Sequence, residues 1–357
     1  RLITQLFGDR MYISNATGCS SIWGGPGATS PYCTDKNGHG PAWSNSLFED
    51  NAEHGYGMYT AQKVIRENLA EKTHALLAID WTAAELKEAA QKWLDTMEDG
   101  AANKEAAKAY IAALEESICD GCDCDACKLA SEILSQKDYL SKKSVWIFGG
   151  DGWAYDIGFG GVDHVLAQNE DVNIFVFDTE VYSNTGGQAS KASNIGQVAQ
   201  FAAAGKETKK KSLAEIAMSY GYIYVAQIAM GANPAQTIKA ITEAEAYNGP
   251  SLIIGYSPCE MHSIKGGMIN CQKEMKKAVE CGYWNLFRFN PASDKKFTLD
   301  SKAPAGGYRE FLMNEARYSR LTREFPERAE GLFTRNEDAA KERYEHLTKL
   351  IDLYDKQ

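Results

Sequence analysis

Two largely apolar runs mark the centre of the chain, Ser144-Val145-Trp146-Ile147-Phe148 and Val172-Asn173-Ile174-Phe175-Val176-Phe177. Runs of this kind, without polar alternation, are typical of parallel strands that are buried on both faces. The chain between them has room for a crossover helix, which we expect from Asp156 to about Gln168. The two strands should therefore lie side by side and run parallel.

Apolar runs and helical periodicity continue to alternate further along the chain. We expect strands at 222–228 and 251–256, and helices near 194–204, 212–220 and 234–247. Such alternation predicts an α/β fold with a mainly parallel sheet flanked by helices.

The segments on either side of this core differ in composition. Residues 1 to about 60 are rich in Gly, Asn, Ser and Trp, which indicates loops. Residues 61–143 carry apolar positions at helical spacing, residues 258–297 are again loop-rich, and 301–357 are charged and helical. We expect an α/β domain over residues 1–300 with a helical insertion at about 61–143, and a helical C-terminal extension over 301–357.

Glycine and short polar residues follow both central strands. Gly150-Asp151-Gly152 comes after the first, and Asp178-Thr179-Glu180-Val181-Tyr182-Ser183-Asn184-Thr185-Gly186-Gly187 after the second. Loops at the carboxyl ends of parallel strands open at one edge of the sheet, where ligands bind. An aspartate between glycines can reach a hard cation, and the bare backbone lets phosphate oxygens approach. The pattern predicts a magnesium and phosphate site; the alternative is two glycine-rich turns that merely close a βαβ unit.

The composition of the chain limits the kinds of molecule that we expect it to bind. The 357 residues carry a formal net charge of −10, whereas nucleic acids and anionic membranes attract basic patches, so we expect neither as a main partner. No long apolar run or secretory pattern occurs, which favours an intracellular, cytoplasmic protein. The chain begins without Met, as though inside a helix, so we expect it to be a piece of a longer protein.

Nine cysteines are too few for a disulfide scaffold, and in an intracellular protein they more often indicate metal or iron–sulfur chemistry. Cys19 lies in Thr17-Gly18-Cys19-Ser20-Ser21, and Cys259 in Ser257-Pro258-Cys259. Each follows an apolar segment among small residues that leave the sulfur uncrowded. Without further context, such a cysteine is more often a small buried filler.

The spacing of the two polar loops resembles the thiamine diphosphate fingerprint, in which Gly-Asp-Gly precedes an asparagine-containing metal loop by about thirty residues. The string from Asp178 to Gln188 resembles the metal loop of pyruvate:ferredoxin oxidoreductases. The two cysteine loops and the string Gly40-Pro41-Ala42-Trp43-Ser44-Asn45-Ser46-Leu47-Phe48-Glu49-Asp50 also resemble this family. The resemblance runs over almost the whole chain and is to the C-terminal, thiamine-binding part of those enzymes.

This resemblance implies roles for individual residues. Mg²⁺ would be held by Asp151, the Thr179 hydroxyl and the Val181 carbonyl. Asn184 would contact the substrate, although an asparagine holding its own turn is the alternative. The cofactor-binding set comprises Gly150, Asp151, Gly152, Trp153, Thr179, Glu180, Val181, Tyr182, Ser183, Asn184 and Cys19.

The resemblance also implies that Cys19 and Cys259 are two of the four thiolates of a 4Fe-4S cluster. The paired cysteines of the family come shortly before the segment that corresponds to Arg1, so we expect this chain alone to hold no stable cluster. Cys19 would lie near the thiazolium, where electrons leave toward the cluster. The activating glutamate, and the arginine and threonine that bind substrate, belong to a separate N-terminal domain in the family.

The function that follows is oxidative decarboxylation of pyruvate to acetyl-CoA and CO2, with electrons passing through 4Fe-4S clusters to ferredoxin or flavodoxin. The implied partners are pyruvate, coenzyme A, the remaining domains of the parent enzyme and a second copy in a homodimer. The implied setting is anaerobic metabolism in the cytoplasm, or a hydrogenosome if the source is eukaryotic. Two alternatives are a non-oxidative thiamine-dependent decarboxylase or synthase, and a non-catalytic module that binds a partner chain.

Three further sets of residues, the clustered cysteines, the loop histidines and a run of lysines, are candidates for a function. Four cysteines, Cys119, Cys122, Cys124 and Cys127, could hold zinc or form a redox pair, or lie in a surface loop. Loop histidines such as His39, His54 and His262 are usually solvated or hydrogen-bonded, and ligation or proton transfer is the alternative. The run Lys209-Lys210-Lys211 indicates a solvated face, or else a docking site for an acidic ferredoxin.

Overall fold

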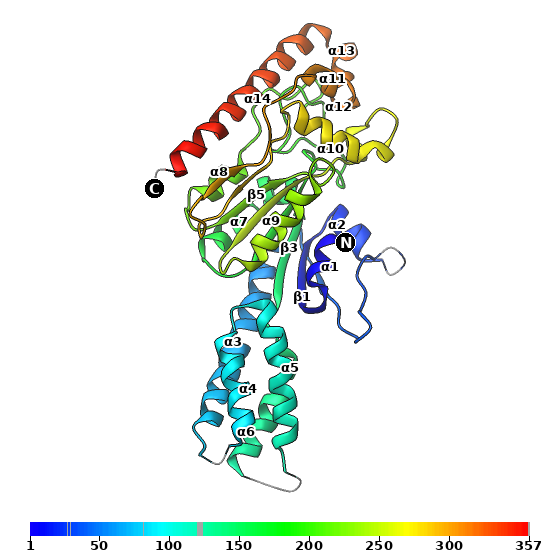
Figure 1. Ribbon diagram of the computed structural model, residues 1–357. Helices are drawn as coiled ribbons and strands as arrows, with labels where there is room; N and C mark the ends of the chain where they lie inside the picture. Colours follow the sequence, from blue (N-terminus) through cyan, green and yellow to red (C-terminus); the bar gives the residue numbers. More distant parts are fainter. Residues whose placement is uncertain (27, 29, 81, 120–123, 356–357) are drawn as a thin grey trace.

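A mainly parallel sheet forms the centre of the protein (Figure 1). This computed structural model describes residues 1–26, 28, 30–80, 82–119 and 124–355. Eight strands occur among the described residues: β1 (Met11–Ala16), β2 (Ala42–Ser46), β3 (Ser144–Gly150), β4 (Asn173–Asp178), β5 (Tyr224–Ile228), β6 (Ser251–Tyr256), β7 (Phe287–Phe289) and β8 (Phe297–Leu299). Their order is β2-β1-β3-β4-β6-β5-β7-β8, with only the β5–β7 and β7–β8 pairs antiparallel. The predicted α/β class is confirmed.

Helices surround the sheet and extend from it. They are α1 (Leu2–Phe7), α2 (Cys19–Gly24), α3 (Asn51–Leu77), α4 (Ala84–Asp95), α5 (Gly100–Ser117), α6 (Asp125–Leu134), α7 (Phe159–Ala167), α8 (Leu213–Met218), α9 (Pro234–Ala246), α10 (Cys271–Glu280), α11 (Tyr308–Met313), α12 (Ala316–Ser319), α13 (Leu321–Glu324) and α14 (Pro326–Asp355). Short turns of helix are η1 (Gly8–Arg10), η2 (Lys137–Tyr139), the π-helical η3 (Gly152–Ile157), η4 (Glu260–His262) and η5 (Met268–Asn270).

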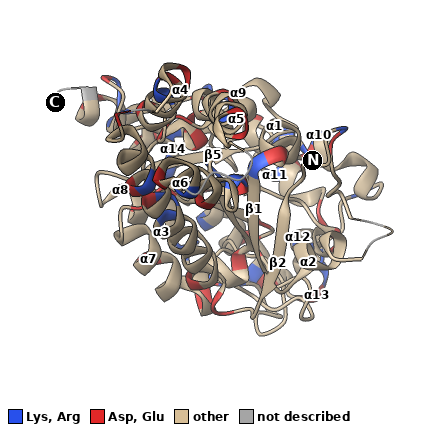
Figure 2. Ribbon diagram, turned by 90° about the horizontal axis from the view of Figure 1, so that it is seen from below, with Lys and Arg blue, Asp and Glu red and all other residues tan. Residues whose placement is uncertain are grey.

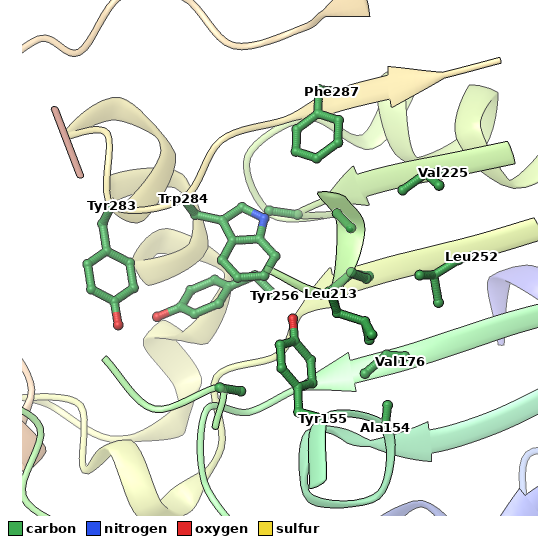
Figure 3. Close-up of a cluster of buried hydrophobic side chains, with 14 of the residues drawn as sticks. Ala154, Tyr155, Val176, Leu213, Val225, Leu252, Tyr256, Tyr283, Trp284 and Phe287 are labelled. Carbon is green, nitrogen blue, oxygen red and sulfur yellow. The ribbon is translucent and has the colours of Figure 1, made fainter. Parts of the chain in front are cut away.

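The two faces of the sheet bury separate apolar clusters. One cluster joins the sheet to α1 and α9 through residues such as Phe7, Trp146 and Ile241. The other joins it to α7, α8 and the C-terminal helices, and it includes aromatic side chains such as Tyr256 and Trp284 (Figure 3). Burial on both faces explains why the central strands are apolar without alternation.

Helices α4, α5 and α6 pack with the second half of α3 around a cluster of their own, which includes Leu69, Trp93, Tyr110 and Ile133. In Figure 1 this bundle projects away from the sheet, while α14 runs along the opposite end of the molecule. The first half of α3 packs closely on β3, because Gly55 has no Cβ to collide with Ile147. One long helix therefore joins the sheet and the bundle.

The strands align four loops at one edge of the sheet. Gly150 of β3 lies beside Phe177 of β4, and Asp178 lies beside Tyr256 of β6. On the other side of β3, Asn15 of β1 lies beside Phe148. The loops that follow β1, β3, β4 and β6 therefore all start at the same carboxyl-terminal edge.

The structure corrects the expectation of loops in two parts of the chain. Residues 1–60 contain β1 and β2 as well as loops, and α3 already begins at Asn51. The loop-rich expectation for 258–297 missed α10 and β7. In the two N-terminal strands, polar residues such as Ser14 and Asn15 replace the apolar run that marked the central strands.

The helix expected near 194–204 is wrong, because this segment forms turns and isolated bridges. Gly196 has a φ of +78°, a left-handed conformation that interrupts a right-handed helix. Its N–H donates to the Lys206 carbonyl, and the Lys206 N–H donates to the Gln197 carbonyl, so backbone groups bond across the loop instead of along a helix.

Acidic and basic residues are mixed along the helices rather than separated by sign (Figure 2). None of the described helices combines the length and apolar character needed to span a bilayer.

Arg66 joins the base of the bundle to the sheet. Its guanidinium donates to the carbonyls of Leu140 at 2.7 Å, Met97 at 2.9 Å and Tyr139 at 3.0 Å. The residue is 7% exposed, and burial lowers its pKa to about 10. Carbonyls from two segments of the chain, one with Met97 and one with Tyr139 and Leu140, thus accept hydrogen bonds from one buried guanidinium.

We predict that Arg66→Met destabilises the bundle by about 3 kcal/mol, because buried carbonyls lose their donors. Urea unfolding, together with hydrogen exchange of peptides from α4 and α5, measures the effect. Arg323→Met at an exposed position is the matched control, expected to change stability by less than about 0.5 kcal/mol. Equal stability of the two variants would contradict the role given to Arg66.

Candidate functional site

A cavity of about 280 Å³ opens where the four aligned loops meet. It is lined by Ala16, Thr17, Gly18, Cys19, Ser20, Trp23, Phe48, Gly150, Asp151, Gly152, Phe177, Thr179, Val181, Tyr182, Ser183, Asn184, Thr185, Ser257, Pro258 and Cys259. The structure thus brings together nearly all of the residues singled out in the sequence. Their binding roles stay predictions.

Three oxygen atoms converge at the base of the cavity. The Thr179 hydroxyl donates to Asp151 Oδ1 at 2.7 Å and lies 2.9 Å from the Val181 carbonyl oxygen. The Thr179 N–H also donates to Asp151 Oδ1 at 3.1 Å, and the Ser190 hydroxyl donates to Oδ2 at 2.6 Å. A carboxylate, a hydroxyl and a carbonyl are ligands that Mg²⁺ prefers.

The electrostatics of Asp151 favour a cation. The side chain is 1% exposed, and the residues that the structure describes include no Lys or Arg in ion-pair contact with it. Burial and the nearby Asp178 raise its pKa to about 7. A divalent cation at the three oxygens would supply the missing positive charge, so the donor set fits Mg²⁺.

The backbone between Thr179 and Val181 is unusual. Glu180 adopts the left-handed region with a φ of +59°, which residues with a side chain rarely adopt. In an extended strand, successive side chains point to opposite faces. Here the chain turns at Glu180 instead, and the turn brings the Thr179 hydroxyl within hydrogen-bond distance of the Val181 carbonyl. The geometry of the oxygen cluster therefore depends on Glu180.

Glu180 and Trp153 do not line the cavity, although the sequence placed both in the cofactor-binding set. The Glu180 carboxylate is fully buried and is bonded to Asn194, Lys210, Tyr283 and Arg317. Trp153 is also fully buried and packs against Gly149 and Gly158. A short-range pattern cannot tell which residues of a loop point into the cavity.

Gly152 allows the two loops to touch. A Cβ on this residue would meet the Tyr182 ring at 2.5 Å, closer than real contacts allow. The absence of a side chain thus lets Tyr182 pack directly on the backbone after β3, where Gly150 and Gly152 both line the cavity. This cradle fits the approach of phosphate oxygens.

Cys19 lies at the start of α2 and faces the loop after β4. Its sulfur lies 3.4 Å from the Ser183 hydroxyl and 3.9 Å from Asn184 Oδ1. Cys19 is exposed, whereas Cys259 is largely buried, and burial raises the pKa of the Cys259 thiol to about 11. Both sulfurs belong to residues that line the same cavity.

Several contributors were missed in the sequence. Trp23 and Phe48 line the cavity from segments that were expected to be loops, and Ser190 bonds Asp151. Trp23 and Ser190 lie close in sequence to Cys19 and to the loop after β4, but no short-range pattern shows that their side chains reach the site. The four-cysteine group includes Cys122, which lies outside the described residues.

The structure tests what the sequence predicted for two loop histidines and for the run of three lysines. His54 lies 2.7 Å from the Ser14 hydroxyl, and His262 lies 2.7 Å from the Thr179 carbonyl, so both are hydrogen-bonded as expected. The solvated face expected for Lys209-Lys210-Lys211 is wrong for Lys210, whose side chain is only 8% exposed and pairs with Asp178 and Glu180.

The chain is similar to a family model and to several known proteins. Residues 127–254 match the family model "Thiamine pyrophosphate enzyme, C-terminal TPP binding domain". The chain is 53% identical to pyruvate:ferredoxin oxidoreductase of Moorella thermoacetica over 99% of its length. It is 50% identical to pyruvate-flavodoxin oxidoreductase of Klebsiella pneumoniae over 98% of its length. The aligned part covers 30% of each of these relatives.

Among solved structures, 2-oxoglutarate:ferredoxin oxidoreductase from Magnetococcus marinus aligns with a TM-score of 0.42 and 15% identity, over 71% of this chain and 56% of that chain. This likeness is too distant to carry an argument. The sequence relationships are much stronger. The chain is a relative of the pyruvate:ferredoxin and pyruvate-flavodoxin oxidoreductases, over a segment that contains a thiamine pyrophosphate-binding domain.

Proposed function

We propose that this chain is the thiamine diphosphate- and Mg²⁺-binding part of an enzyme that converts pyruvate to acetyl-CoA and CO2 and passes electrons through 4Fe-4S clusters to ferredoxin or flavodoxin. The observation that carries the proposal is the convergence of Asp151 Oδ1, Thr179 Oγ1 and Val181 O at the base of the cavity. The names of the relatives at 50% and 53% identity support the substrate and the acceptors.

In this proposal, each group of cavity-lining residues has its own binding role. Asp151, Thr179 and Val181 hold Mg²⁺, while Gly150 and Gly152 leave backbone open to the diphosphate. When bound, thiamine diphosphate supplies the group that takes up the electrons released as the 2-oxo acid loses CO2. Tyr182, Ser183 and Asn184 line the remaining wall of the cavity.

In this proposal, Asn184 contacts the substrate and electrons leave past Cys19. Asn184 is exposed at the cavity, where its amide can donate to a carboxylate or to a developing alkoxide. Cys19 lies next to it and, with Cys259, provides two thiolates of a cluster. A non-oxidative thiamine enzyme has no use for two cysteines in this cavity, so we favour the oxidative reaction.

The proposal extends to the whole protein. The chain spans about 30% of the length of the curated relatives that it matches. We propose that further segments supply the activating glutamate, the other cluster thiolates and the site for coenzyme A, and that the assembly is a cytoplasmic homodimer.

We predict that Asp151→Asn weakens Mg²⁺-dependent binding of thiamine diphosphate by about 100-fold, because the neutral amide cannot balance the cation. Isothermal titration calorimetry on the chain measures this affinity, and chelation of Mg²⁺ should abolish binding by the unaltered chain. Asp338→Asn, at a position whose side chain is 61% exposed on α14, is the matched control and should bind normally. Wild-type affinity in Asp151→Asn would refute the metal site.

We also predict that the 357-residue chain, supplied with Mg²⁺, thiamine diphosphate, coenzyme A and pyruvate without oxygen, does not reduce a low-potential viologen dye. The chain covers only 30% of its relatives, and it presents two cysteines at the cavity. Absorbance of the reduced dye is the measurement. Pyruvate-dependent reduction above the rate of a reaction without protein would show that the proposed division of the active site is wrong.

A further inference from the structure

The loop that carries Thr179 and Val181 is held from beneath by buried charged groups. Its turn requires Glu180 in the left-handed region, with a φ of +59°. A residue with a side chain keeps such a conformation only when its surroundings impose it. The contacts of Glu180 and of the neighbouring Thr179 carbonyl show what imposes it here.

The Glu180 carboxylate points away from the cavity into a set of donors. Arg317 donates to Oε2 at 2.8 Å, and the Tyr283 hydroxyl donates to the same oxygen at 2.5 Å. Oε1 accepts from Asn194 at 2.9 Å and from Lys210 at 3.0 Å. Glu180, Arg317 and Tyr283 are at most 3% exposed. These bonds fix the side chain and therefore limit rotation of the backbone at Glu180.

The Thr179 carbonyl is held by a second contact. His262 Nε2 lies 2.7 Å from this oxygen. A carbonyl oxygen only accepts hydrogen bonds, so Nε2 must carry a proton and donate it. His262 is fully buried at the end of η4, three residues after Cys259. Its backbone N–H donates a hydrogen bond to the Cys259 carbonyl. The same turn of chain thus presents Cys259 to the cavity and holds Thr179.

The two contacts approach each other at Glu315. His262 Nδ1 lies 3.7 Å from Glu315 Oε1, and Arg317 Nε donates to Glu315 Oε2 at 2.6 Å. Arg317 in turn bonds Glu180. Glu315 thus bonds Arg317 and faces His262 without a hydrogen bond, so the supports of Thr179 and Glu180 lie side by side beneath the loop.

We propose that His262, Glu315 and Arg317 are positioning residues that clamp Thr179 and Glu180, so that the Thr179 hydroxyl and the Val181 carbonyl stay turned toward Asp151 before any metal binds. Glu180 is the anchor of this clamp and not a contact of the cofactor. The inference rests on the proposed function, because Mg²⁺ with thiamine diphosphate is the ligand for which the loop is held.

His262→Leu tests the clamp, since it removes the donor to Thr179 and leaves the Glu180–Arg317 contact in place. We expect its Mg²⁺ affinity, measured by titration in saturating thiamine diphosphate, to fall about 10–100-fold, as for residues that orient metal ligands. His262→Gln should restore most of the affinity, because an amide N–H can donate to the same carbonyl.

Arg288→Met is the matched control for lost stability. Arg288 is also a largely buried charge, 11% exposed and paired with Glu243 and Asp300, but it lies on β7, away from the cavity-lining residues. We expect this variant to unfold at a lower temperature and to bind Mg²⁺ with unchanged affinity. A purely structural role for His262 would make His262→Leu behave in the same way and would overturn the proposal.

Hydrogen exchange without ligand separates this inference from the proposed function. In His262→Leu, peptides covering 179–187 should exchange faster, while peptides covering α9 should not change. Unchanged exchange at 179–187 would overturn the clamp. Absence of Mg²⁺-dependent thiamine diphosphate binding by the unaltered chain would instead overturn the proposed function.

Discussion

The fully buried carboxylate of Glu180 is the point on which the candidate site depends. Burying a charge costs several kcal/mol unless opposite charges and hydrogen bonds compensate it. Here the compensation comes from Asn194, Lys210, Tyr283 and Arg317, which lie on four separate segments of the chain. Those segments must all be in place before Glu180 can be buried, so the loop after β4 acquires its shape only in the completed fold.

The pKa values of two carboxylates at this site, those of Glu180 and Asp151, shift in opposite directions. Burial alone would raise the pKa of Glu180, but Lys210 and Arg317 outweigh it and lower the pKa to about 2. Asp151 makes no ion pair among the described residues, and burial together with Asp178 outweighs the more distant Lys210 and raises its pKa to about 7. The positive side chains therefore stabilise the anchor beneath the loop, while the carboxylate in the cavity remains available to a cation.

The C-terminal segment takes part in this arrangement. The sequence suggested a helical extension after residue 300, yet Arg317 from that segment bonds both Glu315 and Glu180 beneath the loop after β4. Leu332, Phe333 and Leu347 of the same segment belong to the apolar cluster on one face of the sheet. Loss of this segment would expose that cluster and leave Glu180 without its guanidinium.

The central strands and the loops that follow them could be predicted from the sequence, because strands buried on both faces require continuous apolar runs and parallel strands end at one edge. Asp151 and Thr179 were therefore recognisable as neighbours although 28 residues separate them. Only the tertiary structure decided which side chains face the cavity. The Lys210 side chain is buried although that of the neighbouring Lys209 is exposed, and His262 and Arg317 reach the loop from distant segments. Their roles arise from long-range charge pairing in a buried environment, which no local pattern of residues records.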